Sequence, residues 1–318
     1  MAPLVEVEHL EKRFGAIAAV NDVSFTVAAG EVLGVLGPNG AGKSTMMRII
    51  AGSLAATSGV ARICGHDTRA QPRAAKACLG YLPEGSPLYA DMTPEGFLDF
   101  VAAARGLDAA TRRGRVGEAI ARLQLEDVLY RPIDTLSKGF KRRLGIAQAL
   151  VHDPRVLILD EPTDGLDPIQ KGAVRGLISE LSADKAIIIS THLLEEVDSI
   201  CHRAIFISAG KVAGGGTPRE LHARAANHNA VSARVDAGEA KRTADLLRGL
   251  PNVASVDQKT EEGATYVVAT PKDGAFIADA VAGALRAAGV DASSLTVETG
   301  SLDDVFTRLT RRGAGARP

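Results

Sequence analysis

An excess of charge of either sign is absent from this chain. Its 318 residues include 37 Lys and Arg against 38 Asp and Glu, which gives a formal net charge of −1. A protein that binds nucleic acid usually presents a basic surface, because Lys and Arg side chains neutralise the phosphate backbone. We therefore expect no nucleic-acid partner.

Long uncharged apolar runs are absent as well. A membrane-spanning helix needs about 18 or more consecutive apolar residues, and no segment of the sequence approaches that length. The first residues, MAPLVEVEHL, place acidic side chains where a secretory signal would carry its apolar segment. These absences predict a soluble chain located in the cytoplasm.

Cysteine is scarce. Cys64, Cys78 and Cys201 are far apart in the sequence and never in C-x-x-C spacing. An odd number with these separations fits neither a disulfide framework nor a common zinc motif. Reduced thiols that pack in the interior are the expectation for a cytosolic protein, and a metal-binding or redox role is the alternative.

Glycine, in contrast, is concentrated in one informative segment, GPNGAGKST. It fits the pattern G-x-x-x-x-G-K-[ST] and lies between an apolar run of strand length, EVLGVL, and a helical segment, TMMRIIAG. Glycines let several backbone N–H groups wrap around a phosphate, and the following helix adds the positive end of its dipole. A turn that matches by chance is the alternative, but the flanking strand and helix favour a nucleotide-phosphate site. Its predicted residues are Gly37, Pro38, Asn39, Gly40, Ala41, Gly42, Lys43, Ser44 and Thr45.

Apolar runs and helical patterns alternate along the first two thirds of the chain. The runs VLILD (156–160) and AIIIST (186–191) alternate with helices, which predicts a parallel sheet. Residues 4–8, LVEVE, alternate in polarity and predict an exposed edge strand. Thr93 and Pro94 favour a helix start. The helical pattern continues from there to about residue 128 and resumes at 138–152, which predicts a helical insert of about 60 residues in an α/β core.

The composition changes near residue 214, where the run GGGTP favours a hinge or turn. The following pattern predicts two helices and four strands in the order βαββαβ, which is the order of a ferredoxin-like α+β domain. We expect a first domain at 1–216, with a helical subdomain at about 86–152, and a second at 217–318. The expected elements of the second domain are strand 229–235, helix 239–249, strand 252–258, strand 264–270, helix 274–289 and strand 294–298.

Residues 4–215 resemble the ATP-binding subunits of ABC transporters. The resemblance rests on five motifs in the family's order. The phosphate loop is followed by LSKGF at the place of the LSGGQ signature, VLILDEP as the Walker B strand, GLDP as the D-loop and STH as the switch-histidine segment. The resemblance implies an ABC-type P-loop ATPase that binds ATP and Mg²⁺.

The resemblance also implies a role for each matching residue. Glu161 is expected to be the general base for the attacking water, and His192 to contact the γ-phosphate. Lys43 is expected to reach the β- and γ-phosphates. Phe14 is expected to stack on adenine. The remaining expectations are Mg²⁺ binding through Ser44, Asp160 and Glu84, and contact with the ATP of a second subunit through Ser137, Lys138, Gly139 and Asp167, which implies a head-to-tail homodimer.

Two departures from the family pattern concern charge. Glu84 stands where the family's Q-loop normally has a neutral Gln, so it adds negative charge beside a triphosphate. Lys138 replaces a signature glycine, and we expect its positive charge to compensate for Glu84 if the two lie close together. These departures, together with DEPTDGLDP and the closing SLDDVFTRLT, resemble ATPases of ABC-2-type export systems.

That resemblance implies separate transmembrane permease subunits, docked near residues 84–105, which hold the chain at the inner face of the membrane. A soluble ABC ATPase of translation or DNA repair is the alternative, although the chain has one phosphate loop and no heptad repeats. A kinase or other P-loop enzyme is a third possibility, and it leaves LSKGF and the switch histidine unexplained.

Overall fold

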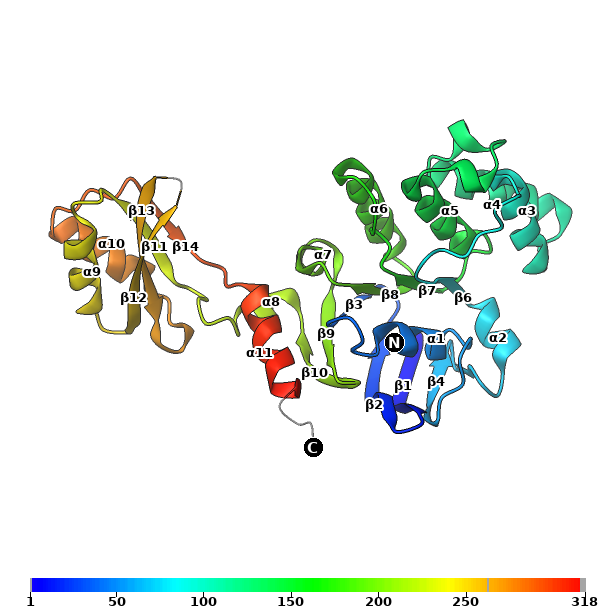
Figure 1. Ribbon diagram of the computed structural model, residues 1–318, viewed down its shortest axis with the longest axis horizontal. Helices are drawn as coiled ribbons and strands as arrows, with labels where there is room; N and C mark the ends of the chain where they lie inside the picture. The colour runs from blue at the N-terminus through cyan, green and yellow to red at the C-terminus, as the bar shows by residue number, and fades with distance from the viewer. Residues whose placement is uncertain (1, 262, 315–318) are drawn as a thin grey trace. The chain divides into compact units, whose positions relative to one another are not determined.

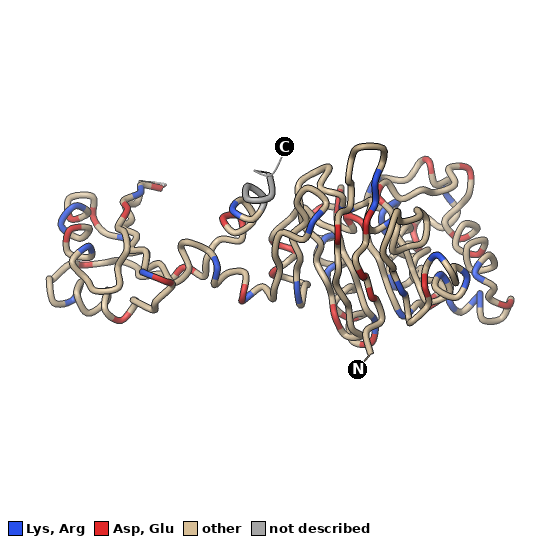
Figure 2. Tube along the Cα trace, turned by 90° about the horizontal axis from the view of Figure 1, so that it is seen from below, with Lys and Arg blue, Asp and Glu red and all other residues tan. Residues whose placement is uncertain are grey.

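The computed structural model describes residues 2–261 and 263–314 (Figure 1). The chain divides into two compact units, one running up to Thr217 and resuming at Leu309, the other formed by Pro218–Arg308. Acidic and basic residues are interspersed along both units (Figure 2). Within the described ranges, no helix combines the length and the apolar character that a membrane crossing requires.

A six-stranded sheet forms the centre of the first unit, in the order β10-β9-β3-β8-β7-β6. All neighbouring strands run parallel except β10, which is antiparallel to β9. Every residue of β3, β7 and β8 is buried, which explains why these strands are apolar except for polar residues at the ends of β7 and β8. The prediction of a parallel sheet is confirmed. The strands are β3 (Val32–Leu36), β6 (Leu79–Leu82), β7 (Val156–Asp160), β8 (Ala186–Thr191), β9 (Arg203–Ser208) and β10 (Lys211–Gly216).

A second sheet of the first unit has the order β2-β1-β4-β5, all antiparallel. The prediction that residues 4–8 form an edge strand is wrong, because β1 pairs with β2 on one side and with β4 on the other. Its alternation instead reflects burial of one face, that of Val5, Val7 and Leu10. The strands are β1 (Val5–Phe14), β2 (Ile17–Val27), β4 (Ser58–Ile63) and β5 (His66–Asp67).

Helix α1 (Lys43–Ile50) lies between the two sheets (Figure 1). Its Met46, Met47 and Ile50 are buried in a core that includes side chains of both sheets. Burying side chains of this size contributes about 1.5–3 kcal/mol each. Because α1 is fixed on both faces, the loop that precedes it has a fixed position at the end of β3.

The helical insert contains α3 (Pro94–Ala104), α4 (Ala109–Arg122) and α5 (Lys138–Leu150). Thr93 caps α3 as expected, since its Oγ1 accepts a hydrogen bond from the N–H of Gly96 at 3.3 Å. The prediction of a continuous helical pattern to residue 128 is wrong. Gly106 adopts φ +84°, which ends α3, and Asp108 caps α4 by accepting hydrogen bonds from the N–H groups of Ala110 and Thr111. Two 3₁₀ turns, Glu126–Val128 and Ile133–Thr135, lead into α5.

The glycine run near residue 214 is not a hinge. Gly214, Gly215 and Gly216 belong to β10 and pair with β9. A Cβ atom at Gly215 would lie 2.6 Å from the carbonyl oxygen of Ala204, and one at Gly214 would lie 3.2 Å from the side chain of Leu309. Close packing therefore explains the glycine at 215, and residues 214–216 belong to a strand rather than to a turn. The other helices of this unit are α2 (Pro72–Ala77), α6 (Pro168–Leu181) and α7 (Leu194–Ile200).

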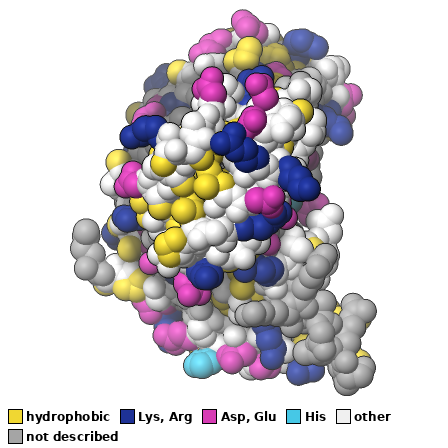
Figure 3. Space-filling model, turned by 90° about the vertical axis from the view of Figure 1, so that its left-hand side faces the viewer, with side chains coloured by type: hydrophobic (Ala, Val, Ile, Leu, Met, Phe, Trp, Pro, Cys, Tyr) yellow, Lys and Arg dark blue, Asp and Glu magenta, His cyan; other side chains and the backbone are white. Residues whose placement is uncertain are grey.

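The second unit is built on a four-stranded antiparallel sheet in the order β12-β13-β11-β14. Helices α9 and α10 pack on one face of the sheet through Leu247, Val281 and Leu285. Figure 3 shows a group of apolar side chains on the face turned to the viewer, with charged side chains of both signs around it. Its elements are α8 (Pro218–His222), β11 (Val231–Val235), α9 (Ala240–Arg248), β12 (Val253–Glu261), β13 (Ala264–Pro271), α10 (Ala278–Ala287) and β14 (Ser294–Val297), followed by α11 (Leu302–Ala314).

Five of the six elements expected in this region agree with the structure to within about three residues. The exception is the helix expected to begin at 274, which begins at Ala278. Asp273 and Gly274 both adopt left-handed backbone conformations, with φ of +51° and +67°, so the chain turns before the helix starts. Residue 262 and residues 315–318 of the expected second domain lie outside the described residues.

Candidate functional site

The glycine-rich loop connects β3 to α1, as its sequence context predicts. Two of its glycines have no room for a side chain. A Cβ atom would lie 2.2 Å from the carbonyl oxygen of Ile207 at Gly37, and 2.1 Å from that of Ala19 at Gly42. Gly42 also adopts φ +106°, which a residue with a side chain rarely adopts. The fold around the loop therefore requires glycine at both positions.

Lys43 begins α1 and is buried. Its Nζ donates hydrogen bonds to the carbonyl oxygens of Gly37, at 2.6 Å, and Pro38, at 3.2 Å. Burial lowers the pKa of the Lys43 ammonium, while nearby carboxylates act to raise it. Lys43 thus lies across its own loop, at one wall of a cavity of about 260 Å³. That cavity is lined by Ala19, Asn39, Gly40, Gly42, Lys43, Ser44, Thr45, Glu84 and Glu161.

Two carboxylates come from the end of β7. Asp160 is buried and accepts a hydrogen bond from the hydroxyl of Ser190. Ser190 is the register partner of Asp160 on the neighbouring strand β8, which explains the contact. The N–H of Glu161 donates to the carbonyl oxygen of Ser190, at 3.2 Å, and to its hydroxyl, at 3.1 Å. Ser190 therefore holds the turn that follows β7.

Glu161 and His192, the two predicted catalytic residues, are in direct contact. Their Oε2 and Nδ1 atoms are 2.7 Å apart. Burial raises the pKa of the Glu161 carboxyl, and its hydrogen bond with His192 acts in the opposite direction. Glu161 also adopts φ +53°, a conformation that is uncommon for a residue with a side chain. A carboxylate held in this way beside a lysine is suited to orienting a water molecule and accepting its proton.

Glu84 and Lys138 line a common cavity, so the structure brings these two charged departures together. This second cavity has a volume of about 460 Å³ and adjoins the first, since Asn39, Glu84 and Glu161 line both. Lys138 is exposed, at the first position of α5. The remaining residues that line this cavity are Gly85, Ser86, Lys141, Arg142, Asp164 and His192.

The signature and D-loop residues lie at helix starts. Ser137 caps α5 by accepting a hydrogen bond from the N–H of Phe140 at 3.3 Å, and Asp167 caps α6 by accepting one from Gln170 at 2.9 Å. A Cβ atom at Gly139 would lie 2.4 Å from Oε1 of Gln170, so a side chain there would displace the Gln170 side chain. Ser137, Gly139 and Asp167 line neither of the two cavities of their own chain.

Phe14 lies at the end of β1, half exposed. Its ring centroid is 5.0 Å from Nζ of Lys12, and it lines neither cavity. Pro38, Ala41 and Asp160 also line neither cavity, although Pro38 accepts a hydrogen bond from Lys43.

Five polar residues of the site had no assigned role in the sequence: Ser86, Lys141, Arg142, Asp164 and Ser190. Ser190 belongs to the STH motif, so its strand position was a usable signal. Arg142 lies in the run KRR (141–143), and nothing in that run distinguishes the arginine that faces the site from the one that faces away. That distinction depends on the rotation of α5 and on its neighbours.

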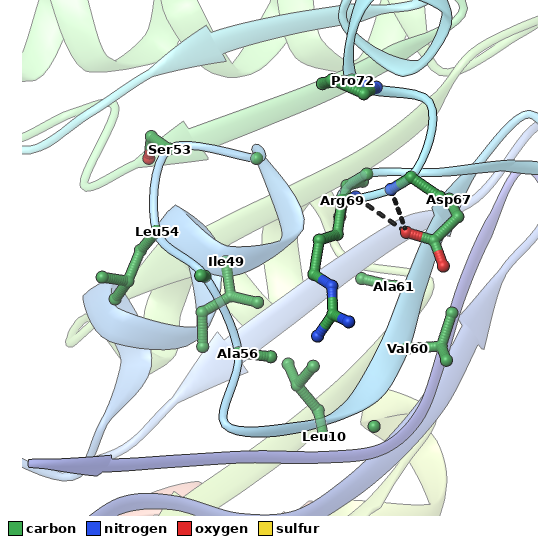
Figure 4. Close-up of a pocket in the computed structure, with 15 residues that line it drawn as sticks. Leu10, Ile49, Ser53, Leu54, Ala56, Val60, Ala61, Asp67, Arg69 and Pro72 are labelled. Carbon is green, nitrogen blue, oxygen red and sulfur yellow. Dashed lines mark hydrogen bonds between the residues drawn. The ribbon is translucent and has the colours of Figure 1, made fainter.

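A third cavity, of about 440 Å³, lies between the end of α1, β4 and the start of α2 (Figure 4). Figure 4 shows the guanidinium of Arg69 extending toward Ala56 and Leu10, while the carboxylate of Asp67 accepts backbone hydrogen bonds. None of the predicted site residues lines this cavity. It is therefore separate from the candidate nucleotide site.

Comparisons with known proteins identify relatives of this chain. The family model described as "ABC transporter" matches residues 20–164. The Nod factor export ATP-binding protein I of Paraburkholderia xenovorans (strain LB400) is 39% identical over 218 residues, which cover 68% of this chain and 72% of that protein.

Two solved structures have a similar fold. An ATP-binding subunit of an ABC transporter has a TM-score of 0.65 and 32% identity, covering 69% of this chain and 92% of that one. A dimeric post-hydrolysis state of the ATP-binding cassette MJ0796, bound to ADP and Pi, has a TM-score of 0.62, covers 67% and 98% of the two chains and is 24% identical, so it supports the fold alone. A nucleotide-binding P-loop fold and these relatives lead to one conclusion: this chain belongs to the ABC transporter family, as one of its ATP-binding, ATP-hydrolysing subunits.

Proposed function

We propose that the cavity beside Lys43 holds the triphosphate of ATP, and that Glu161 is the general base of its hydrolysis. The contact between Glu161 and His192, at 2.7 Å, is the observation that supports this assignment most strongly. In this arrangement Glu161 takes the proton of the attacking water. His192 holds the carboxylate in position and contacts the γ-phosphate.

Mg²⁺ is the metal that the donor set fits. Mg²⁺ prefers oxygen ligands and is usually held by one or two carboxylates together with substrate phosphates. Ser44 and Glu84 line the phosphate cavity, and Asp160 lies at the end of the adjacent strand β7. Among the described residues, no three His, Cys, Asp or Glu side chains form a self-contained metal site, so phosphate oxygens would complete the coordination. Bound Mg²⁺ would neutralise negative charge on the transferred phosphoryl group.

The ATP site is proposed to be completed by a second copy of the chain. Ser137, Lys138 and Gly139 begin α5, and helix starts are favourable positions for phosphate. Ser137, Gly139 and Asp167 line neither cavity of their own chain, which fits a role toward the ATP of a neighbouring subunit. We propose a head-to-tail homodimer with two ATP molecules, in which Phe14 of each chain stacks on adenine. Such a stack is worth about 1–3 kcal/mol.

An aromatic cluster in the helical insert is the proposed docking site for a transmembrane permease. The ring of Tyr89 makes edge contacts with Phe97 and Phe100, at centroid distances of 6.0 and 5.7 Å. Tyr89 and Phe100 are about half exposed, whereas Phe97 is buried. Exposed aromatic side chains next to a buried one offer a partner helix a firm apolar surface. Through this contact the subunit would lie at the inner face of a membrane.

We further propose an ABC-2-type exporter, because the relative described above is named for export and the motifs resemble that branch. Its alternative is an ABC ATPase that is not coupled to transport. The two differ in partner: an exporter subunit copurifies with the membrane protein encoded beside it and is stimulated or restrained by it. Absence of any membrane complex would favour the alternative.

Replacing Tyr89 and Phe100 with alanine is expected to release the subunit from its permease. The double variant loses the exposed part of the aromatic cluster, and central interface aromatics often contribute 2 kcal/mol or more, so binding is expected to weaken at least about thirtyfold. Copurification with the neighbouring membrane protein measures this. Hydrolysis by the isolated subunit should be unchanged. Tyr130→Ala is the matched control, because Tyr130 is exposed in the same insert and outside the cluster; equal retention of both variants would contradict the docking site.

The region of about 217–318, which contains the second unit, is proposed to be a ferredoxin-like accessory domain. Counting its strands from the first to the fourth, the sheet order is 2-3-1-4 with βαββαβ connectivity, which supports this classification. The first domain is correspondingly proposed at 1–216, with its helical subdomain at about 86–152.

The assignment of the ATP site is tested by phosphate release from ATP by the purified chain. We expect hydrolysis that requires Mg²⁺ and stops when EDTA is added. Equal binding of nucleotides with and without a triphosphate, and no phosphate release at any Mg²⁺ concentration, would reject the assignment.

A further inference from the structure

Arg142 is a buried cation beside the candidate site, and the roles described so far do not use it. It lies near the start of α5, with its side chain 8% exposed. Its Nη1 donates to the hydroxyl of Ser86 at 3.2 Å and to the carbonyl oxygen of Asp160 at 3.4 Å. Arg142 therefore connects three segments: α5, the loop after β6 and the end of β7.

The surroundings of Arg142 are acidic. Its Nη2 lies 3.9 Å from a carboxylate oxygen of Asp164, and Glu84 and Glu161 line the same cavity. Burial lowers the pKa of the Arg142 guanidinium, and these carboxylates act to raise it. Guanidinium remains charged at any physiological pH. A fixed positive charge thus stands among the acidic groups of the site.

The loop that carries Glu84 depends on α5 for its conformation. Gly85 and Ser86 adopt left-handed conformations, with φ of +77° and +44°. Such a conformation at a non-glycine residue costs about 1–3 kcal/mol and persists only where the surroundings hold it. Ser86 is held by the hydrogen bond from Arg142 and by close packing at Gly145, where a Cβ atom would lie 3.0 Å from its hydroxyl.

We propose that Arg142 is a positioning residue for ATP hydrolysis: it offsets the negative charge of Glu84 and holds the Glu84 loop against the end of β7. The inference rests on the proposed ATP site. Lys138 lines the same cavity as Glu84, but it is exposed, and charge on an exposed side chain is screened by water and salt. Arg142 is buried and bonded to both segments, so it adds to Lys43, the buried cation of the phosphate cavity, in making a carboxylate tolerable beside the triphosphate.

A double-mutant cycle between Arg142 and Glu84 tests the charge compensation. ATP affinity is measured in EDTA with a fluorescent ATP analogue, so that the readout does not require hydrolysis. Arg142→Gln should weaken binding about tenfold, because coupled charges commonly interact by that amount. Adding Glu84→Gln should restore affinity to within about twofold of the wild-type chain. Purely additive effects of the two substitutions would overturn the inference.

The positioning role is tested by Arg142→Lys. Lysine keeps the charge but lacks the planar guanidinium, in which Nη1 bonds Ser86 and Asp160 while Nη2 lies beside Asp164. The variant should bind ATP within about twofold of wild type and hydrolyse it about tenfold more slowly, which separates kcat from affinity. A loss of affinity as large as that of Arg142→Gln would contradict this separation.

Arg143→Gln is the matched control. Arg143 is the next residue and equally buried, but it donates to the carbonyl oxygens of Leu123 and Gln124 at 3.1 Å and contacts the ring of Phe140. Its loss should lower the thermal midpoint without changing ATP affinity and without coupling to Glu84. If the wild-type chain bound no ATP, the proposed function would fail; if it bound ATP and the Arg142 and Arg143 variants behaved alike, only the role of Arg142 would fail.

Discussion

The Glu161→Gln variant is expected to bind ATP and to hydrolyse it about 10²–10⁴-fold more slowly than the wild-type chain. Loss of a general base usually reduces a rate by that factor. Gln keeps the size of the side chain and an oxygen that accepts the bond from His192, so the site should stay intact. ATP affinity should therefore change little. Phosphate release under single-turnover conditions measures the rate of the chemical step directly.

Glu195→Gln is the matched control for this experiment. Glu195 is a surface carboxylate in α7, three residues after His192, and it pairs with Arg175 at 2.7 Å. It lines neither cavity of the site. Hydrolysis should be unchanged in this variant, because exposed ion pairs contribute about 1 kcal/mol or less to stability. If the Glu161→Gln chain turned over ATP at the wild-type rate, another residue would have to be the base.

Replacing Lys43 with methionine is expected to reduce ATP affinity about 10–100-fold. Methionine preserves most of the buried volume and removes the ammonium group. Hydrogen bonds to charged groups are worth about 1.5–3 kcal/mol, and in the folded chain Nζ stands at the wall of the phosphate cavity. The stabilisation of the fold by ATP, measured as the shift of the thermal midpoint with ligand concentration, should be nearly lost.

Lys185→Met separates this effect from the general consequence of losing a buried lysine. Lys185 is as buried as Lys43, and its Nζ pairs with Asp153 at 2.8 Å, away from both cavities of the site. The control should lower the thermal midpoint of the free chain and leave the ATP-induced shift intact. Equal ATP-induced shifts in the two variants would show that Lys43 has no part in binding phosphate.

The strands and the loop of the site were predictable because each has a local sequence pattern that is typical of its structure. β7 and β8 are apolar up to the polar residues at their ends, Asp160 in β7 and Ser190 and Thr191 in β8, and such runs are typical of strands covered on both faces. The phosphate loop combines a motif with a strand before it and a helix after it. The order of elements in the second unit was predictable for the same reason, because the spacing of apolar residues differs between strands and helices.

Other features depend on neighbours that the sequence does not reveal. The alternation of apolar and polar residues in LVEVE indicates that one face of the strand is buried. It does not indicate how many strands pair with it, so β1 was predicted to be an edge strand. The run GGG is typical of a turn when it is considered in isolation, yet Gly215 lies in β10. Glycine is needed there because the carbonyl oxygen of Ala204 leaves no space for a side chain. The helical pattern after Thr93 hid the break at Gly106, because apolar spacing continues beyond it.

In the candidate site as well, some features were predictable from motifs and others depend on the fold. Glu161 and His192 were predicted from separate motifs, and their 2.7 Å contact arises because β7 and β8 are adjacent and parallel. Whether Glu84 and Lys138 lie together could not be decided from the sequence, and in the structure both line the same cavity. The buried cation among those carboxylates, Arg142, could not be told from Arg143 without the rotation of α5.

The central claim is that each chain supplies two half-sites, a phosphate loop for its own ATP and a signature segment for the ATP of its neighbour. The mass and nucleotide content of the Glu161→Gln chain in solution, with and without ATP, test it most directly. The account predicts a monomer without nucleotide and, with ATP and Mg²⁺, a dimer that retains two ATP molecules. A chain that binds ATP at saturation and remains a monomer would contradict it.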